Sequence, residues 1–64
     1  MKDYRCYLLN AGHIVRAESL SARNDKEAIE TSKAIFQRLR DKHSGYEVWQ
    51  LDRRVFQFDE DRVA

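Results

Sequence analysis

The chain is short and nearly neutral. Its 64 residues suffice for one domain, 1–64, and a domain of this size buries only about 60% of the surface that its unfolded chain exposes. Twelve Lys and Arg side chains against eleven Asp and Glu lack the basic excess typical of nucleic-acid-binding domains. An apolar fraction of 42% argues against a disordered chain, and no apolar run is long enough to span a membrane.

A single cysteine limits how so small a domain is stabilised. Cys6 cannot form a disulfide within the chain, and a lone reduced cysteine is typical of a cytoplasmic protein. No apolar signal core follows Met1, which agrees with a cytoplasmic location. Since disulfides and a structural zinc site are not available, self-association remains, and we expect a homodimer.

The first third of the chain predicts a β-hairpin. Strands are expected over 4–9 and 13–20, because Asn10-Ala11-Gly12 between them is a turn in which Gly12 supplies a positive φ. With Ala11 and Gly12 as the loop, polar and apolar side chains sort onto opposite faces. A three-residue loop with a bulge at Gly12 is the alternative, and it mixes the faces. The expected cross-strand pairs are Leu9 with Ile14, Tyr7 with Arg16, and Arg5 with Glu18.

A helix is expected over 25–42. Asn24 is a suitable N-cap, and Glu27 stands where its side chain can bond back to the capping residue. Cationic residues at the C-terminal end suit the helix dipole, and Gly45 can close the helix. One apolar stripe recurs at helical spacing and predicts the buried side of the helix: Ala28, Ile29, Ser32, Ile35, Phe36 and Leu39.

The last third predicts a second β-hairpin. Strands are expected over 46–51 and 54–59, around a loop at Asp52-Arg53. This loop pairs Trp49 with Phe56 and Leu51 with Arg54. Asp-Arg is a weaker turn signal than Asp-Gly, so a bulge in this hairpin is an open alternative.

These segments predict an α+β fold of order ββαββ. One helix would cover one face of a four-stranded antiparallel sheet, giving two layers. The covered face would hold Leu8, Val15, Ala17, Trp49 and Phe56. The open face would hold Tyr7, Leu9, Ile14, Val48 and Val55 among Arg5, Arg16, Glu18 and Gln50, and Tyr46 shares the face of Val48.

The order of several short motifs resembles a known type of domain. Y-x-x-Y-L-L is followed by G-H-I, by N-D-x-x-A-I at the expected helix start, and by Y-E-V-W-Q. In this order the chain resembles short uncharacterised bacterial strand-strand-helix-strand-strand domains of unknown function. The resemblance implies the same layout from about Tyr4 to Phe58, and it implies no activity, cofactor or site residue.

No group of residues predicts catalysis. Cys6 with His13 or His43 is the one conceivable nucleophile and base, but Cys6 is expected to point into the covered face, where a thiol is inert. His13, His43 and the acidic residues Asp59-Glu60-Asp61 lack the spacing of a zinc or calcium site. Gly12 and Gly45 stand alone, so there is no phosphate-binding loop. We therefore expect no enzyme activity, no metal, no cofactor and no small-molecule substrate.

The apolar residues of the open face are the main functional signal. They exceed what one helix can cover, so we expect a non-enzymatic protein-interaction module that associates with itself or with another protein through this face or an edge strand. The candidate interaction surface is Tyr7, Leu9, Ile14, Arg16, Val48 and Val55. The alternative is a small nucleic-acid-binding or regulatory domain that uses Lys33, Arg38, Arg40, Lys42, Arg53 and Arg54.

Overall fold

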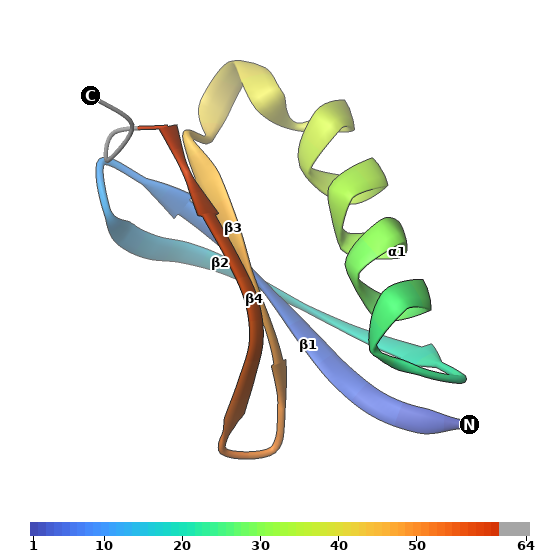
Figure 1. The fold of residues 1–64 in the computed structure, drawn as a ribbon. Helices are drawn as coiled ribbons and strands as arrows, with labels where there is room; N and C mark the ends of the chain where they lie inside the picture. The colour runs from blue at the N-terminus through green and yellow to red at the C-terminus, as the bar shows by residue number, and fades with distance from the viewer. Residues whose placement is uncertain (61–64) are drawn as a thin grey trace.

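The computed structural model describes residues 1–60. Four strands form one antiparallel sheet of order β2-β1-β3-β4, and one helix covers one of its faces (Figure 1). This confirms the predicted α+β fold of order ββαββ. The elements are β1 (Lys2–Asn10), β2 (His13–Ala22), α1 (Asp25–Arg38), the 3-10 helix η1 (Arg40–Lys42), β3 (Gly45–Gln50) and β4 (Arg53–Asp59).

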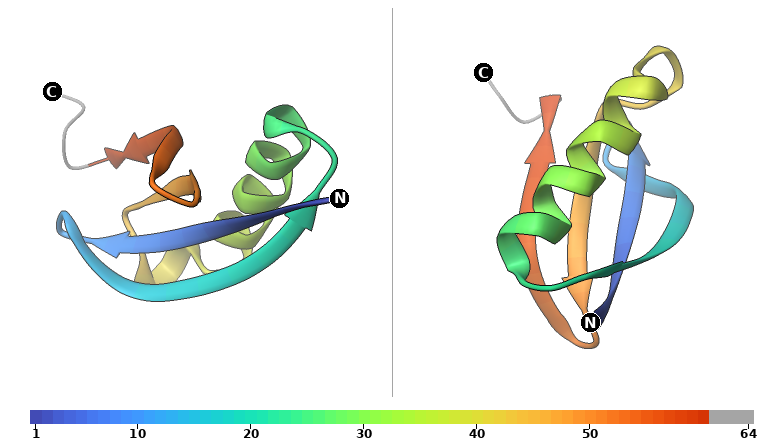
Figure 2. Two further views of the ribbon diagram at one scale, coloured as in Figure 1. Left: turned by 90° about the horizontal axis from the view of Figure 1, so that it is seen from below. Right: turned by 90° about the vertical axis from the view of Figure 1, so that its right-hand side faces the viewer.

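The sheet is strongly twisted. Figure 2 shows β1 and β2 as two long curved strands that run side by side, and α1 runs diagonally across the strands. β3 pairs only with residues Arg5–Leu9 of β1, so the first residues of β1 pair with β2 alone. In the strand order β2-β1-β3-β4, the two edges of the sheet are β2 and β4.

The helix begins as predicted and ends earlier. The Asn24 side chain accepts a hydrogen bond from the Glu27 N–H at 2.9 Å, as expected of an N-cap. The carboxylate of the Glu27 side chain accepts hydrogen bonds from Arg23, one residue before the cap, instead of from the backbone N–H of Asn24. α1 stops at Arg38 and gives way to η1, and Gly45 belongs to β3 instead of closing the helix. The predicted helical range of 25–42 was thus too long.

A β-bulge changes the register of the first hairpin. Ala11 and Gly12 form the two-residue turn, with φ values of 54° and 82°, and Leu9 faces Ile14 as predicted. Between Leu8 and Leu9 the register shifts, which leaves an extra residue on β2. The other two predicted pairs were therefore wrong: Tyr7 faces Ala17, Arg5 faces Ser19, and Arg16 and Glu18 face Leu8 and Cys6.

The second hairpin turns one residue earlier than predicted. Its loop is Leu51-Asp52, with Leu51 at a φ of 54° and 92% exposed. A register shift between Val48 and Trp49 then makes Val48 the partner of Phe56. The predicted pairs of Trp49 with Phe56 and of Leu51 with Arg54 were wrong. The observed pairs are Gln50 with Arg53, Trp49 with Arg54, Val48 with Phe56, and Tyr46 with Phe58.

The two bulges redistribute side chains between the faces of the sheet. Val48 and Tyr46, expected on the open face, are 0% and 4% exposed and belong to the cluster beneath α1. Trp49, expected under the helix, lies near Tyr7 instead, with ring centroids 6.4 Å apart. The buried cluster consists of Tyr4, Cys6, Leu8, Ala22, Ala28, Phe36, Tyr46 and Val48.

A polar network joins the start of α1 to both hairpins. The buried Tyr4 donates a hydrogen bond from its hydroxyl to Asp25 Oδ1 at 2.8 Å. Arg53 donates to both Asp25 carboxylate oxygens at 3.1 Å. Because bidentate pairs fix geometry, this network holds the β3–β4 turn and β1 against the first turn of α1.

Gly45 lies where two strands approach closely. A Cβ built at this position would stand 2.3 Å from the backbone oxygen of Phe58. We predict that Gly45→Ala lowers the free energy of unfolding by about 1–3 kcal/mol, because the clash is with backbone that no side-chain rotation relieves. Urea unfolding measures the change. As a control, Ala11→Gly relieves a positive φ and should leave the protein equally or more stable; a Gly45→Ala variant of wild-type stability would contradict the assignment.

The Asp25 network predicts an acid dependence of stability. Hydrogen bonds from Arg53 and then Tyr4 hold the pKa of Asp25 below its usual value of 3.8. The stabilisation is therefore present above that value and is lost as the pH falls through the lowered folded-state pKa. Asp25→Asn should lower the melting temperature at neutral pH and flatten its fall in acid, as followed by circular dichroism. Asp52→Asn, in the exposed turn, is the matched control and should retain the wild-type profile; an Asp25→Asn profile parallel to wild type would refute the prediction.

Candidate protein-interaction groove

A largely apolar hollow of about 400 Å³ lies between α1 and β4. We call it the aromatic groove. Its helical side is formed by Ile29, Glu30, Lys33, Phe36, Gln37 and Arg40, and its sheet side by Tyr46, Phe56 and Phe58.

The groove exists because α1 does not cover the whole sheet. The helix packs most closely on β3 and only lightly on β4. As a result Phe56, on the edge strand, remains 37% exposed, whereas Phe36 and Tyr46 are buried. An exposed aromatic side chain beside a hollow is a common feature of binding surfaces.

The aromatic rings of the groove form one packed group. The centroid of Tyr46 is 5.2 Å from that of Phe36 and 5.7 Å from that of Phe56, while Phe36 and Phe58 are 5.8 Å apart in an edge-on arrangement. These separations lie in the range at which aromatic pairs attract one another. The floor of the groove is therefore held in place by its own packing.

Polar groups accompany the apolar lining. Tyr46 is only 4% exposed, yet its hydroxyl makes no hydrogen bond within residues 1–60, and burial raises its pKa above the usual value. It is thus a neutral phenol with a free donor. On the rim, Lys33 has no ion-pair partner in the described part of the chain, while Arg40 is paired with Glu60.

The six residues of the candidate interaction surface that the sequence suggested differ in their burial. Val48 is 0% exposed and belongs to the cluster beneath α1, so the expectation that it lies on the open face was wrong. Leu9 is outside that cluster but only 2% exposed, so it does not contribute an open surface. Tyr7 and Val55 are partly buried, and Val55 packs against the core cluster. Ile14, 57% exposed, and Arg16 remain at the surface on β2. The six residues therefore do not form one continuous face.

Of the two central residues of the groove, sequence reasoning placed one on the correct face. Phe56 was predicted on the helix-covered face and lies there, although its exposure of 37% was not foreseen. Tyr46 was predicted on the open face, which was wrong because the predicted register lacked the bulge between Val48 and Trp49. The pattern Phe56-Gln57-Phe58 was the available signal, since aromatic residues two apart on a strand share a face. Which strand would be an edge was not contained in that pattern.

The basic residues of the alternative hypothesis fall into separate groups. Arg53 is bound to Asp25 at the first turn of α1, whereas Arg40 is bound to Glu60 beyond the other end of the helix. A helix of 14 residues separates these two ends by about 20 Å. Arg54 adjoins Arg53, while Arg38 and Lys42 adjoin Arg40. The six cations therefore do not build one basic patch.

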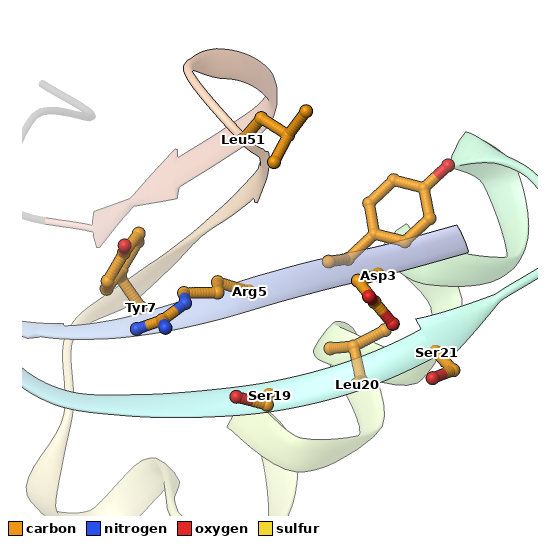
Figure 3. Close-up of a pocket in the computed structure, with 8 residues that line it drawn as sticks. Asp3, Arg5, Tyr7, Ser19, Leu20, Ser21 and Leu51 are labelled. Carbon is orange, nitrogen blue, oxygen red and sulfur yellow. The ribbon is translucent and has the colours of Figure 1, made fainter.

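A second hollow, lined by both polar and apolar side chains, lies on the sheet beyond the end of β3. It has a volume of about 610 Å³, and Figure 3 shows the Arg5 side chain lying along β1 toward Tyr7, with Leu51 on the β3–β4 turn across from them. It contains neither cysteine nor histidine, so its lining offers no nucleophile paired with an imidazole base. The remaining lining residues are Asp3, Tyr4, Ser19, Leu20 and Ser21.

The residues considered for chemistry are dispersed. Cys6 is 0% exposed beneath α1, and His13 is exposed beside the first turn. His43 Nδ1 lies 2.8 Å from the carbonyl oxygen of Leu39, within hydrogen-bonding distance. Residues 1–60 contain no group of three or more potential metal ligands, and Asp61 lies outside the described residues. Within the same residues no helix is long and apolar enough to cross a membrane.

The burial of Cys6 predicts an unreactive thiol. Burial raises its pKa, and the nearby Ser32 hydroxyl lowers it by less, so little thiolate is present at neutral pH. A chromogenic disulfide reagent should label Cys6 far more slowly in the native protein than in urea. An exposed cysteine introduced as Ser21→Cys should react at once under native conditions. Rapid native labelling of wild-type Cys6 would contradict this burial.

Comparison with known proteins adds no family to this geometry. No protein-family model, no curated protein and no solved structure matches the chain. The resemblance described above consequently transfers no residue role. The proposed function therefore depends on the aromatic groove and on the two sheet edges.

Proposed function

We propose that this chain is a non-enzymatic protein-interaction module that binds an extended segment of a partner protein in the aromatic groove. The observation that carries the proposal is the 37% exposed Phe56, which stands on an edge strand with its ring centroid 5.7 Å from that of Tyr46 in the lining of the groove. A hollow with an apolar lining and few polar groups is typical of recognition sites.

The edge position of β4 favours an extended segment. β4 is the last strand of the sheet order, so the outer backbone groups of its residues Arg53–Phe58 face no further strand within residues 1–60. A peptide that adds to such an edge gains main-chain hydrogen bonds, and side-chain pockets beside the edge supply specificity. Here the pocket lies between β4 and α1, directly beside Phe56 and Phe58.

The lining also indicates the chemistry of the segment. An aromatic or aliphatic side chain would pack on Phe56 and Phe36, which removes the remaining exposed ring surface from water. An acidic residue next to this anchor would accept hydrogen bonds from the Lys33 ammonium group and the Tyr46 hydroxyl. We therefore propose a partner strand in which an apolar anchor stands beside a carboxylate.

Two observations support this function over the other classes. Cys6, His13 and His43, which the sequence offers as the one conceivable nucleophile and base, line neither hollow. Apart from Lys33 within α1, the basic side chains fall at opposite ends of the helix, and two of them are already paired with carboxylates. Mixed, paired charge is typical of a solvated surface.

Selection from a displayed library of random peptides tests the proposal. Selected peptides should carry the apolar–acidic pattern, and Phe56→Ser should weaken their binding by about tenfold or more in calorimetry, because the anchor loses its contact. Ile14→Ser removes a comparably exposed apolar side chain from the opposite edge and should leave the affinity unchanged. Circular dichroism checks that both variants are folded. Peptides that bind Phe56→Ser as tightly as wild type, or a selection without binders, would overturn the proposal.

A further inference from the structure

The second edge of the sheet carries a charge pattern that is complementary to itself. β2 is the first strand of the sheet order, and Arg16 and Glu18 lie two residues apart on its helix side. Arg16 Nε donates to Glu18 Oε1 at 2.8 Å, and their side chains are 54% and 35% exposed. Ala17 between them is also exposed.

We propose that a second copy of this chain adds to β2 in antiparallel orientation, about a two-fold axis at Ala17. The two four-stranded sheets would then join into one continuous sheet of eight strands. Such an isologous contact uses the same edge twice, so every contact occurs in duplicate.

The charges select this register. When two copies of one strand pair about a two-fold axis, the facing side chains must lie on the same side of the sheet. Facing residues are therefore an even number of positions apart in the sequence, and the axis passes beside the single residue midway between them. An axis at Arg16 or at Glu18 would set like charges directly opposite each other, which is destabilising. An axis at Ser19 would set Glu18 opposite Leu20. The axis at Ala17 sets Arg16 of each copy opposite Glu18 of the other.

The ion pair between Arg16 and Glu18 within each chain also favours this contact. Arg16 and Glu18 are already held together within one chain, so the two copies would form a ring of four charges of alternating sign. In such a ring each side chain that is ordered serves two partners, whereas an isolated surface pair orders two side chains for one contact.

The bulge in β2 is compatible with the register. The shift beside Leu8 leaves Val15 as the extra residue, and regular pairing along β2 resumes at Arg16. The three central residues of the proposed contact, Arg16 to Glu18, therefore lie within the regular part of the strand. The exposed Val15, at 55%, borders the contact and would be partly shielded by the second copy.

The two proposed contacts use opposite edges. β2 and β4 are the outermost strands, so pairing at β2 leaves both aromatic grooves accessible. A dimer would present two grooves to a partner. The inference does not depend on the groove, and either can fail without the other.

Charge reversal tests the register by sedimentation velocity over a concentration series. Wild type should form a dimer, and Arg16→Glu and Glu18→Arg should each weaken it by about tenfold or more, because each sets like charges opposite each other. Mixing the two variants should produce a heterodimer, since the carboxylate introduced in one copy then faces the guanidinium introduced in the other. The intrachain pair is lost in both variants, so only a contact between copies explains recovery on mixing.

Further variants serve as controls and test the position of the two-fold axis. Arg54→Glu applies the same charge change to the opposite edge and should leave the dimer unchanged. Ala17→Cys should form a disulfide-linked dimer under mild oxidation, since directly opposed residues have Cα atoms about 4.5–5.5 Å apart. Ser21→Cys should not. A wild-type protein that stays monomeric, a mixture that does not associate, or crosslinking at Ser21 in place of Ala17 would overturn the inference.

Discussion

The width of a single helix limits how much of the sheet is covered. An α-helix with its side chains is about 10–12 Å across, whereas four strands at about 4.8 Å spacing form a wider surface. α1 lies diagonally over the sheet and packs most closely on β3, so the outer strand β4 is covered incompletely (Figure 2). The exposed ring of Phe56 and the groove beside it follow from this mismatch. A second helix would have closed the groove.

The β-bulges determine which side chains use that surface. Each bulge inserts one residue and thereby moves the rest of its strand to the opposite face. In β4 this shift brings Phe56 and Phe58 to the helix side with Tyr46 and Val48. In β2 it places Arg16 and Glu18 together beside Leu8 and Cys6, with Ala17 on the other face. Both proposed contacts depend on these shifts.

The stabilising contacts lie at the two ends of the β3–β4 hairpin. Asp25, Tyr4 and Arg53 join the start of α1 to β1 and to the β3–β4 turn. Gly45 allows β3 to approach Phe58 and Asp59 closely at the other end of the hairpin. Since these contacts lie at the ends of β4 and not on β2, the middle of β4 and the outer edge of β2 remain available for other chains. Bulges are also a known protection of edges against unspecific pairing, so a contact there needs the matched charges or the pocket described above.

The sequence by itself determined the elements, because the signals for them are local. Asn24 caps the helix through a contact three residues away, and Ala11-Gly12 turns the first hairpin through its own backbone angles. The fold class followed from the order of these segments. The register beyond the first pair did not, since a bulge reflects packing between strands instead of a preference of one residue. The turn at Leu51 illustrates this, because a leucine at positive φ has no local reason to be there. The aromatic groove joins α1 to residues of β3 and β4 that are distant along the chain, and only the tertiary structure decided which strands are edges and which rings stay exposed.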